Sequence, residues 1–272
     1  MKSQKDRNRR RAFGQNFLID NEIINKLITD IDCTENDWLI EIGPGQGALT
    51  RPLLGKCQNI SVIEIDKKWV SYLGSRKDFS PLSIIQGDAS TIDVDNLFKN
   101  KQDSDNPSDS KPILVGNLPY NRAGPILNNF VPRISDFKYQ YFMVQYEVAK
   151  RITASPHSRS FGALSVFIQN YAKTSLAQKI PPDAFKPRPK IFSATVRLEA
   201  LPQPLIDNPH FFPFVHTAFA QKRKKLVNVL SSSFKKDELI KHLQQIGQQE
   251  NCRAEDLSVE DFAKLFKALN VE

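Results

Sequence analysis

Short apolar runs alternate with helical stretches along the first half of the chain. Five of these runs have the length and composition of buried strands, and they cover 38–43, 60–65, 82–87, 112–116 and 139–145. Strands that alternate with helices are typical of parallel β-α-β units, because each connecting helix covers one face of the sheet. The pattern predicts an α/β fold with a doubly wound sheet, whose ligands bind at the carboxyl ends of the strands.

The pattern changes near residue 203. A strand-like segment at 191–198 gives way to Leu-Pro-Gln-Pro, and apolar residues then recur at helical spacing. The expected helices cover 211–219, 224–230, 237–246 and 259–269. We therefore predict a core domain over 13–203 and a small helical domain over 204–272. A helical tail suits a dimerisation element or, if the core proves to be an RNA methyltransferase, a domain that docks on structured RNA.

Composition sets limits on the class of protein. The 272 residues, 40% of them hydrophobic, suffice for one large α/β domain with a small appendage. Cys33, Cys57 and Cys252 lack C-x-x-C spacing, so we expect neither a metal site nor a disulfide framework. No apolar run approaches the length of a membrane span. We expect a cytoplasmic protein without a membrane anchor, with a surface loop over the polar stretch 99–111.

The charge of the chain favours an RNA partner. The net charge is +8, and much of the excess lies in an N-terminal arm, 1–12, whose first eleven residues include six basic residues and one acidic residue. Such an arm binds phosphate groups with an affinity that falls as salt rises. A second basic cluster, 222–225, opens an expected helix. This cluster either grips RNA or forms a solvated helix face.

The tetrapeptide Asn-Leu-Pro-Tyr, from Asn117 to Tyr120, follows a short buried strand and indicates specific chemistry. An amino group conjugated to an aromatic ring is a poor nucleophile because its lone pair is delocalised. The Asn117 amide oxygen and a backbone carbonyl held by Pro119 could accept hydrogen bonds from such an amine, and the Tyr120 ring could stack on its base. The same residues also suit an ordinary turn from strand to loop, so the tetrapeptide alone does not decide.

A glycine-rich loop upstream predicts a nucleotide-like ligand. Gly43, Gly45 and Gly47 follow the first strand and let the backbone pass close to a ligand. Glu64 ends the next strand, 21 residues beyond Gly43, which is the spacing at which an acidic side chain reaches a ribose. Asp88 follows the third strand and could accept a hydrogen bond from an adenine amino group.

Two cofactors fit this arrangement, a dinucleotide and S-adenosylmethionine. The dinucleotide fingerprint is G-x-G-x-x-G, whereas this chain reads G-P-G-Q-G after a Glu on the strand. The difference, together with the acid at the third strand, favours S-adenosylmethionine.

Several segments in this order resemble the ribosomal RNA adenine N6-dimethyltransferase family. They are Phe-Gly-Gln-Asn-Phe-Leu at 13–18, Glu-Ile-Gly-Pro-Gly-Gln-Gly-Ala-Leu-Thr at 41–50, Val-Ile-Glu-Ile-Asp at 62–66, Gly-Asp-Ala at 87–89 and Asn-Leu-Pro-Tyr at 117–120. Segments at 145–151, 161–166, 181–190 and 222–228 resemble the branch that modifies two adjacent adenines near the 3′ end of small-subunit rRNA. The resemblance implies a Rossmann-like class I methyltransferase domain that uses S-adenosylmethionine. It also implies that a monomer acts on the small ribosomal subunit and takes part in its biogenesis.

The resemblance implies a set of cofactor-binding residues. Asn16 and Leu18 are expected to line the cofactor site, and Gly43 is expected beside the methionine part. Glu64 is the expected ribose ligand, and Asp88 is the expected adenine ligand.

The resemblance also implies a catalytic set. Asn117 is expected to serve both the cofactor and the target pocket, with Leu118 and Pro119 completing the tetrapeptide. Tyr120 is expected to stack on the target base, and Phe185 to cover the other face of that base. Four nearby prolines suggest that Phe185 lies in a stiff loop, although a plain core aromatic is the alternative.

Two segments depart from the family pattern. Arg122 and Gly124 stand where relatives more often have an apolar residue followed by Ser or Thr, and 155–160 lacks the usual glycine after its proline. Neither departure touches the expected reacting groups. Three functions stay open: the small-subunit enzyme, a related large-subunit rRNA methyltransferase that confers drug resistance, and an assembly factor that has lost transfer.

Overall fold

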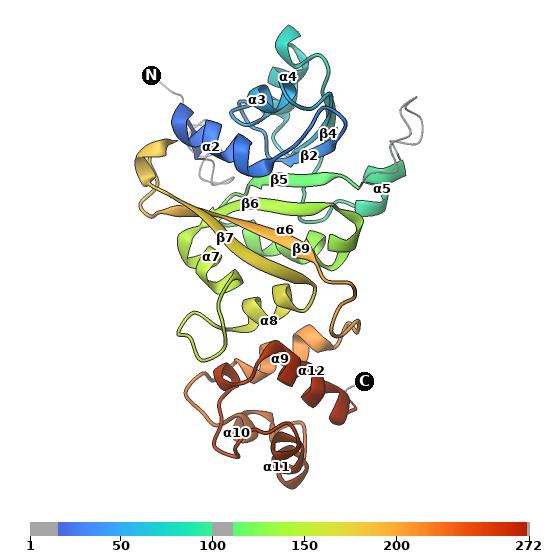
Figure 1. Ribbon diagram of the computed structural model, residues 1–272, viewed down its shortest axis with the longest axis vertical. Coiled ribbons are helices and arrows are strands. Elements are labelled where there is room, and N and C mark those ends of the chain that lie inside the picture. Colours follow the sequence, from blue (N-terminus) through green and yellow to red (C-terminus); the bar gives the residue numbers. More distant parts are fainter. Residues whose placement is uncertain (1–15, 100–110, 271–272) are drawn as a thin grey trace. The chain divides into compact units, whose positions relative to one another are not determined.

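The computed structural model describes residues 16–99 and 111–270, and the chain divides into two compact units (Figure 1). The first unit holds the chain up to residue 149 together with 175–200, and the second holds 150–174 together with the chain from 201 onward. The expected boundary near 203 lies close to the division after 200. The segment 150–174, expected in the core domain, joins the second unit because its apolar residues pack with the C-terminal helices. The N-terminal arm, 1–12, and the loop residues 100–110 lie outside the described residues.

The first unit is built on a seven-stranded sheet with the order β4-β3-β2-β5-β6-β9-β7. The strands are β2 (Trp38–Ile42), β3 (Asn59–Glu64), β4 (Ser83–Gln86), β5 (Ile113–Asn117), β6 (Tyr139–Gln145), β7 (Ala172–Ile180) and β9 (Ser193–Ala200). Strands β2 to β6 pair in parallel, whereas β9 runs antiparallel to β6. The doubly wound α/β prediction is confirmed, and all five strands predicted from the apolar runs form. Strands β3 and β5 flank β2 on opposite sides, so the order of the strands reverses between β2 and β5. A ligand crevice is expected at such a point, at the carboxyl ends of β2 and β5.

The edge strand β7 was not predicted. Its residues are mostly polar and exposed, with burial at its two ends only. A strand at the edge of a sheet has one neighbouring strand, so it needs less apolar surface than a central strand. The hydrophobic pattern along the chain therefore does not reveal it.

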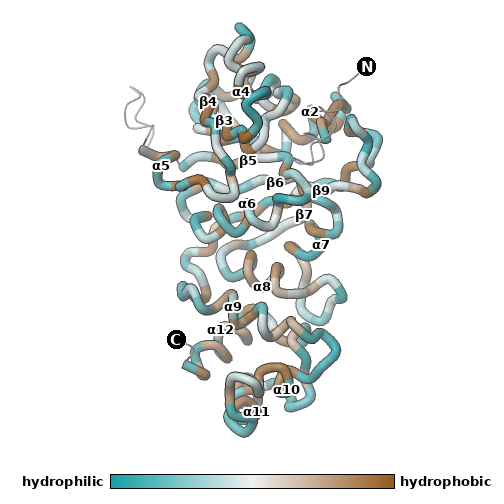
Figure 2. The backbone as a smooth tube through the Cα atoms, turned by 180° about the vertical axis from the view of Figure 1, so that it is seen from behind, coloured by the Kyte–Doolittle hydropathy of each residue, from teal (hydrophilic) through white to brown (hydrophobic). Residues whose placement is uncertain are grey.

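Helices connect the strands of the first unit. They are α2 (Asn21–Ile31), α3 (Thr50–Leu54), α4 (Lys67–Gly74), α5 (Val94–Lys99), α6 (Ala123–Phe130) and α7 (Tyr146–Ile152), with 3-10 turns η1 (Lys77–Phe79), η2 (Val131–Asp136) and η3 (Pro182–Ala184). Helix α2 shows how the sequence sets an element. The Asp20 side chain caps its first turn by accepting from the backbone N–H groups of Glu22 and Ile23 at 3.0 and 3.1 Å. Figure 2 shows hydrophobic positions gathered on strands and helix faces, with hydrophilic positions in the loops.

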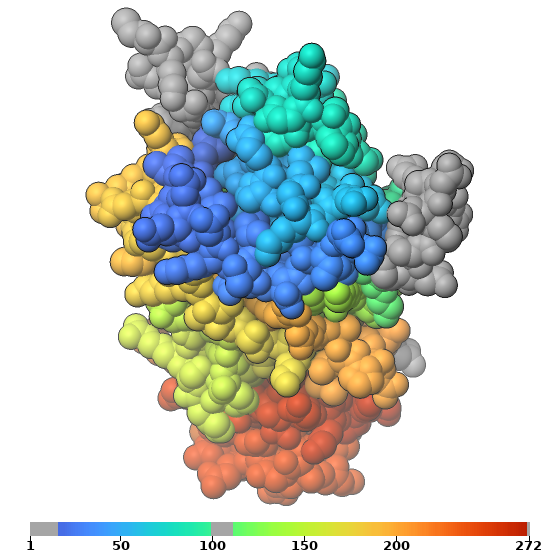
Figure 3. Space-filling model, turned by 45° about the horizontal axis from the view of Figure 1, so that its top comes forward, coloured from blue at the N-terminus to red at the C-terminus, as the bar shows by residue number. Residues whose placement is uncertain are grey.

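A separate two-stranded sheet joins distant parts of the first unit. Strand β1 (Phe17–Leu18) pairs antiparallel with β8 (Phe185–Lys186), and Leu18 faces Phe185 in the register. In Figure 3 the blue surface of the N-terminal residues lies beside the yellow surface of the segment that contains β8.

The second unit is helical. It contains α8 (Ala163–Gln169), α9 (Phe211–Ala218), α10 (Leu226–Leu230), α11 (Lys236–Gln245), the turn η4 (Ala254–Asp256) and α12 (Val259–Ala268). The four helices predicted beyond residue 203 all form, around a core rich in buried phenylalanines. The basic residues 222–225 are exposed just before α10. No helix in the described part of the chain is long and apolar enough to cross a membrane.

Candidate functional site

A pocket opens at the carboxyl edge of the parallel strands in the first unit. It encloses about 990 Å³ of space, its open mouth included. The loops after β2, β3, β4 and β5 form its walls together with β1. Nine of the ten residues predicted from the sequence line it, namely Asn16, Leu18, Gly43, Glu64, Asp88, Asn117, Leu118, Pro119 and Tyr120. Asn16 and Asn117, which are 101 positions apart in the chain, thus meet in one place.

The glycine loop forms one wall, and its backbone needs glycine. Gly43, Gly45 and Gly47 have φ angles of 68°, 53° and 82°. A Cβ at Gly47 would lie 2.4 Å from the Phe79 ring, and one at Gly45 would lie 2.9 Å from the Phe17 ring. The loop therefore combines a left-handed backbone with close packing. A residue with a side chain would be strained in this backbone conformation and would collide with the neighbouring rings.

We expect Gly47→Ala to destabilise the protein by about 2 to 4 kcal/mol, because it adds backbone strain and overpacks the buried Phe79 ring. Urea denaturation will measure the loss in the free energy of unfolding. Gly124→Ala in α6 is the matched control, since no atom lies within 4 Å of its added Cβ. We expect that control to be neutral or slightly stabilising. An equal loss in both variants would contradict the steric argument.

Glu64 fixes this loop from the end of β3. Its carboxylate accepts hydrogen bonds from the backbone N–H groups of Gly45 at 3.1 Å and Asp66 at 2.8 Å. The side chain is 2% exposed, and burial raises the pKa of Glu64. Both carboxylate oxygens are thus hydrogen-bonded to the backbone of the pocket wall. The expected hydrogen bond between Glu64 and a ribose stays a prediction.

Glu41 is a pocket residue that the sequence analysis did not assign. It lies within β2, is 2% exposed, and accepts a hydrogen bond of 2.6 Å from the Thr50 hydroxyl. Burial, with a smaller contribution from the charge of Glu64, raises the pKa of Glu41 to about 7. An acidic residue inside an apolar strand was the available signal, because a buried charge is costly unless it serves a local purpose.

This pKa predicts a pH-dependent stability. The ordinary pKa of Glu41 is 4.5 and the folded value is about 7, so the folded state binds the proton more tightly. The stability it contributes is complete below pH 4.5 and is lost as the pH rises to 7. Glu41→Gln keeps an oxygen for Thr50 but does not titrate. We expect the variant to gain roughly 3 kcal/mol relative to the parent between pH 4.5 and pH 8.

Urea denaturation of both proteins at several pH values will test this expectation. Parallel stability curves for the parent and Glu41→Gln would contradict it.

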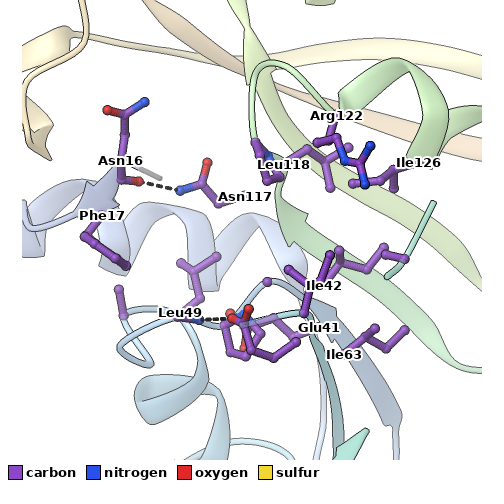
Figure 4. A pocket seen from close by; sticks show the side chains of 18 of the residues that line it. Asn16, Phe17, Glu41, Ile42, Leu49, Ile63, Asn117, Leu118, Arg122 and Ile126 are labelled. Atoms are coloured by element: carbon purple, nitrogen blue, oxygen red, sulfur yellow. Dashed lines mark hydrogen bonds between the residues drawn. The ribbon is translucent and has the colours of Figure 1, made fainter. Parts of the chain in front are cut away.

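Asp88 lines the pocket after β4 and is held by three hydrogen bonds. Its Oδ1 accepts from the Ser90 N–H at 2.9 Å and the Ser90 hydroxyl at 2.6 Å, and its Oδ2 accepts from the Arg122 guanidinium. Burial alone would favour the neutral acid, but the bonds from Ser90 and the charge of Arg122 lower the pKa of Asp88. Arg122, one of the departures from the family pattern, therefore lies in the pocket wall (Figure 4). It is bonded there to Asp88, the expected adenine ligand.

Asn117 ends β5 with a fixed side chain. Its Nδ2 donates a hydrogen bond of 3.1 Å to the Asn16 carbonyl, and Figure 4 shows the two residues joined across the pocket. This bond sets the orientation of the amide and leaves its oxygen as an acceptor for a ligand. The following Leu118 N–H donates to the Met143 carbonyl at 3.0 Å, which anchors the tetrapeptide over the end of β6.

Tyr120 lies at the end of the tetrapeptide with its ring half-buried. Its hydroxyl forms a hydrogen bond of 2.6 Å with the Ser193 hydroxyl, at the start of β9. Burial raises the pKa of Tyr120, so the hydroxyl is neutral at physiological pH. The structure thus places a neutral, anchored aromatic ring in the pocket wall.

Phe185 is the one predicted site residue that does not line the pocket. Its side chain is 3% exposed and packs in the core cluster that includes Leu18, Ile180 and Ala184. In this structure Phe185 is therefore a core aromatic, which was the alternative considered in the sequence analysis. A role for Phe185 against the second face of a target base stays a prediction, and it requires the ring to turn out of the core. The surrounding prolines indicated a stiff segment but not the direction of the ring.

Comparison with known proteins identifies relatives over nearly the whole chain. The family model for ribosomal RNA adenine dimethylase matches residues 6–271. A protein of Xylella fastidiosa (strain 9a5c) named ribosomal RNA small subunit methyltransferase A is 38% identical over 95% of each chain. A protein of the same name from Francisella tularensis subsp. novicida is 38% identical over 96% of this chain and 97% of its own.

Solved structures support the fold. A dimethyladenosine transferase from Plasmodium falciparum superposes with a TM-score of 0.76 at 22% identity, over 93% of this chain and 97% of its own. The 23S rRNA methyltransferase ErmE superposes with a TM-score of 0.68 at 21% identity, over 94% of this chain and all of its own. At these identities the likeness establishes a Rossmann-like fold with C-terminal helices.

Proposed function

The chain belongs to the ribosomal RNA adenine dimethylase family, and from this membership we infer that it methylates two adjacent adenines near the 3′ end of small-subunit (16S) rRNA. Each transfer would place a methyl group from S-adenosylmethionine on the N6 amino group, giving N6,N6-dimethyladenine. The observation that carries the proposal is the meeting of Glu64, Asp88 and the tetrapeptide 117–120 in one pocket. The relatives named for small-subunit methylation, at 35 to 38% identity, favour this substrate over large-subunit rRNA.

The pocket residues fit S-adenosylmethionine. When bound, it supplies an electrophilic methyl group on a sulfonium. We propose that Gly43 lies beside its methionine part, that Glu64 binds the ribose hydroxyls and that Asp88 accepts from the adenine amine. The lowered pKa of Asp88 keeps its carboxylate ionised at neutral pH, so both oxygens can act only as acceptors. Asn16 and Leu18 complete this part of the wall.

The target amine would be held by the tetrapeptide. The Asn117 oxygen and a backbone carbonyl beside Pro119 would accept hydrogen bonds from the two N–H groups of the amine. These bonds make the nitrogen more tetrahedral and its lone pair more available. Holding the amine in line for attack can contribute up to about 7 to 11 kcal/mol in the best cases. The nitrogen would form its bond to the methyl carbon as the carbon–sulfur bond breaks, with the sulfur leaving as a neutral thioether. No strong base is required, because the methylated nitrogen would carry a positive charge and lose its proton to water.

The target adenine must leave any base stack before it can reach this pocket. We propose that Tyr120 stacks on one face of the base. For two transfers to the same nitrogen, the pocket must also let the amine rotate and must exchange the spent cofactor.

We propose that the protein acts as a cytoplasmic monomer on the small ribosomal subunit and assists its assembly. The N-terminal arm, 1–12, and the exposed cluster 222–225 supply positive charge for rRNA phosphates. The helical domain, 204–272, would dock on the subunit.

The test uses purified protein and labelled S-adenosylmethionine, with small ribosomal subunits that lack the modification in one reaction and large ribosomal subunits in another. We expect mass spectrometry of the nucleosides to find dimethyladenine at two neighbouring positions near the 3′ end. Label only in large-subunit rRNA would replace the proposal with the resistance-type activity. Bound subunits without label would leave an assembly factor.

A further inference from the structure

An exposed cluster of aromatic and basic side chains lies at the carboxyl edge of the sheet, outside the pocket. It consists of Tyr146, Lys179 and Phe192, which we name the edge platform. The Lys179 ammonium lies 4.6 Å from the centre of the Tyr146 ring and 4.3 Å from that of the Phe192 ring. Phe192 is 44% exposed, although a large apolar side chain is more often buried.

The platform is joined to the pocket through the strand ladder. The Tyr146 N–H donates to the Phe192 carbonyl at 3.0 Å, immediately beyond the last pair of β6 and β9, Gln145 with Ser193. Ser193 in turn holds the Tyr120 hydroxyl at 2.6 Å. The residue that follows Phe192 in the chain is therefore hydrogen-bonded to the hydroxyl of Tyr120, whose ring is proposed to stack on the target base.

The platform itself carries a positive charge. Lys179 is exposed, and among the described residues no ion pair joins it to a carboxylate. An aromatic face beside an exposed cation is the combination with which proteins bind single-stranded nucleic acid, stacking a base and attracting its phosphate. A protein partner would suit the exposed Phe192 but would leave this cation unexplained.

We propose that the edge platform binds a second nucleotide, one adjacent to the adenine held in the pocket, by stacking its base on Phe192 with Lys179 near its phosphate. This inference rests on the proposed function for the identity of the RNA. The edge platform would be the binding site for the nucleotide next to the target adenine. Such a site suits a substrate with two adjacent adenines.

The test is a fluorescence titration with a short single-stranded RNA that contains two adjacent adenines, one of them replaced by 2-aminopurine. Stacking quenches this base. We expect Phe192→Leu to weaken binding by roughly 5- to 100-fold and to remove the quenching, while Phe192→Trp retains both. Lys179→Met should lower the slope of log affinity against log salt by about one. Cofactor affinity and melting temperature should not change in any of these variants.

Leu176→Ala is the matched control. Leu176 lies on β7, the strand that carries Lys179, and like Phe192 it is an exposed apolar residue, 40% exposed. Phe192→Leu with parent-like affinity and quenching would overturn the platform, even if the parent methylates small-subunit rRNA. Phe192-dependent RNA binding without methyl transfer by the parent would instead overturn the proposed function and leave the platform standing. Retention of a protein by Phe192, with no effect on RNA, would replace the nucleotide by a protein partner.

Discussion

Asn117→Ala is expected to reduce methyl transfer by about 1000-fold, the size of effect seen when one positioned polar group is removed from a reacting centre. The side chain ends β5 in the pocket, and its Nδ2 is tied to the Asn16 carbonyl at 3.1 Å. Its oxygen is therefore oriented before substrate arrives. Alanine removes the acceptor for the target amine but leaves the walls formed by Glu64 and Asp88, so cofactor binding should persist in part.

Single-turnover transfer and cofactor titration will separate these two effects. Asn117→Asp keeps an oxygen acceptor but loses the donor to Asn16, so we expect a smaller loss than with alanine. Asn25→Ala, at an exposed position of α2, is the matched control and should transfer at the parent rate. Transfer at the parent rate by Asn117→Ala would refute the acceptor role.

Tyr120→Ala is expected to lower kcat/KM for the RNA substrate by roughly 10- to 100-fold, because stacking of a base on an aromatic ring contributes about 1 to 3 kcal/mol. Tyr120→Phe keeps the ring and loses only the bond to the Ser193 hydroxyl. We expect that variant to stay within about threefold of the parent, since one neutral hydrogen bond contributes about 1 kcal/mol or less.

Steady-state kinetics on unmodified small subunits, with circular dichroism to confirm folding, will measure both variants. Equal losses for Tyr120→Ala and Tyr120→Phe would show that the hydroxyl matters and the ring face does not. In that case stacking on Tyr120 would have to be abandoned.

The strands of the sheet could be predicted because their cause is local. A central strand such as β2 or β3 is buried on both faces, so its apolar run is visible in the sequence itself. The helices α9 and α12 show the corresponding helical spacing. The edge strand β7 and the two-residue strands β1 and β8 have no such pattern. They form because other segments offer them backbone partners.

The division of the chain into two units shows the same limit. The segment 150–174 contains Phe161 and Val166, which are fully buried in the core of the second unit. Its apolar residues suit either unit when the sequence is considered alone. Only the packing of side chains from distant segments assigns it.

The sequence by itself predicted nine of the residues that line the pocket, in part because residues that end parallel strands meet at one edge of the sheet. Gly43, Glu64, Asp88 and Asn117 were located on this basis or by the family resemblance, and all four line the pocket. The tertiary structure alone decided how these groups are held. It joined Arg122 to Asp88, raised the pKa of Glu41 and turned the Phe185 ring into the core. The spacing of apolar residues along the chain predicts the local backbone conformation. Burial, pKa shifts and side-chain direction depend instead on residues that are far away in the chain.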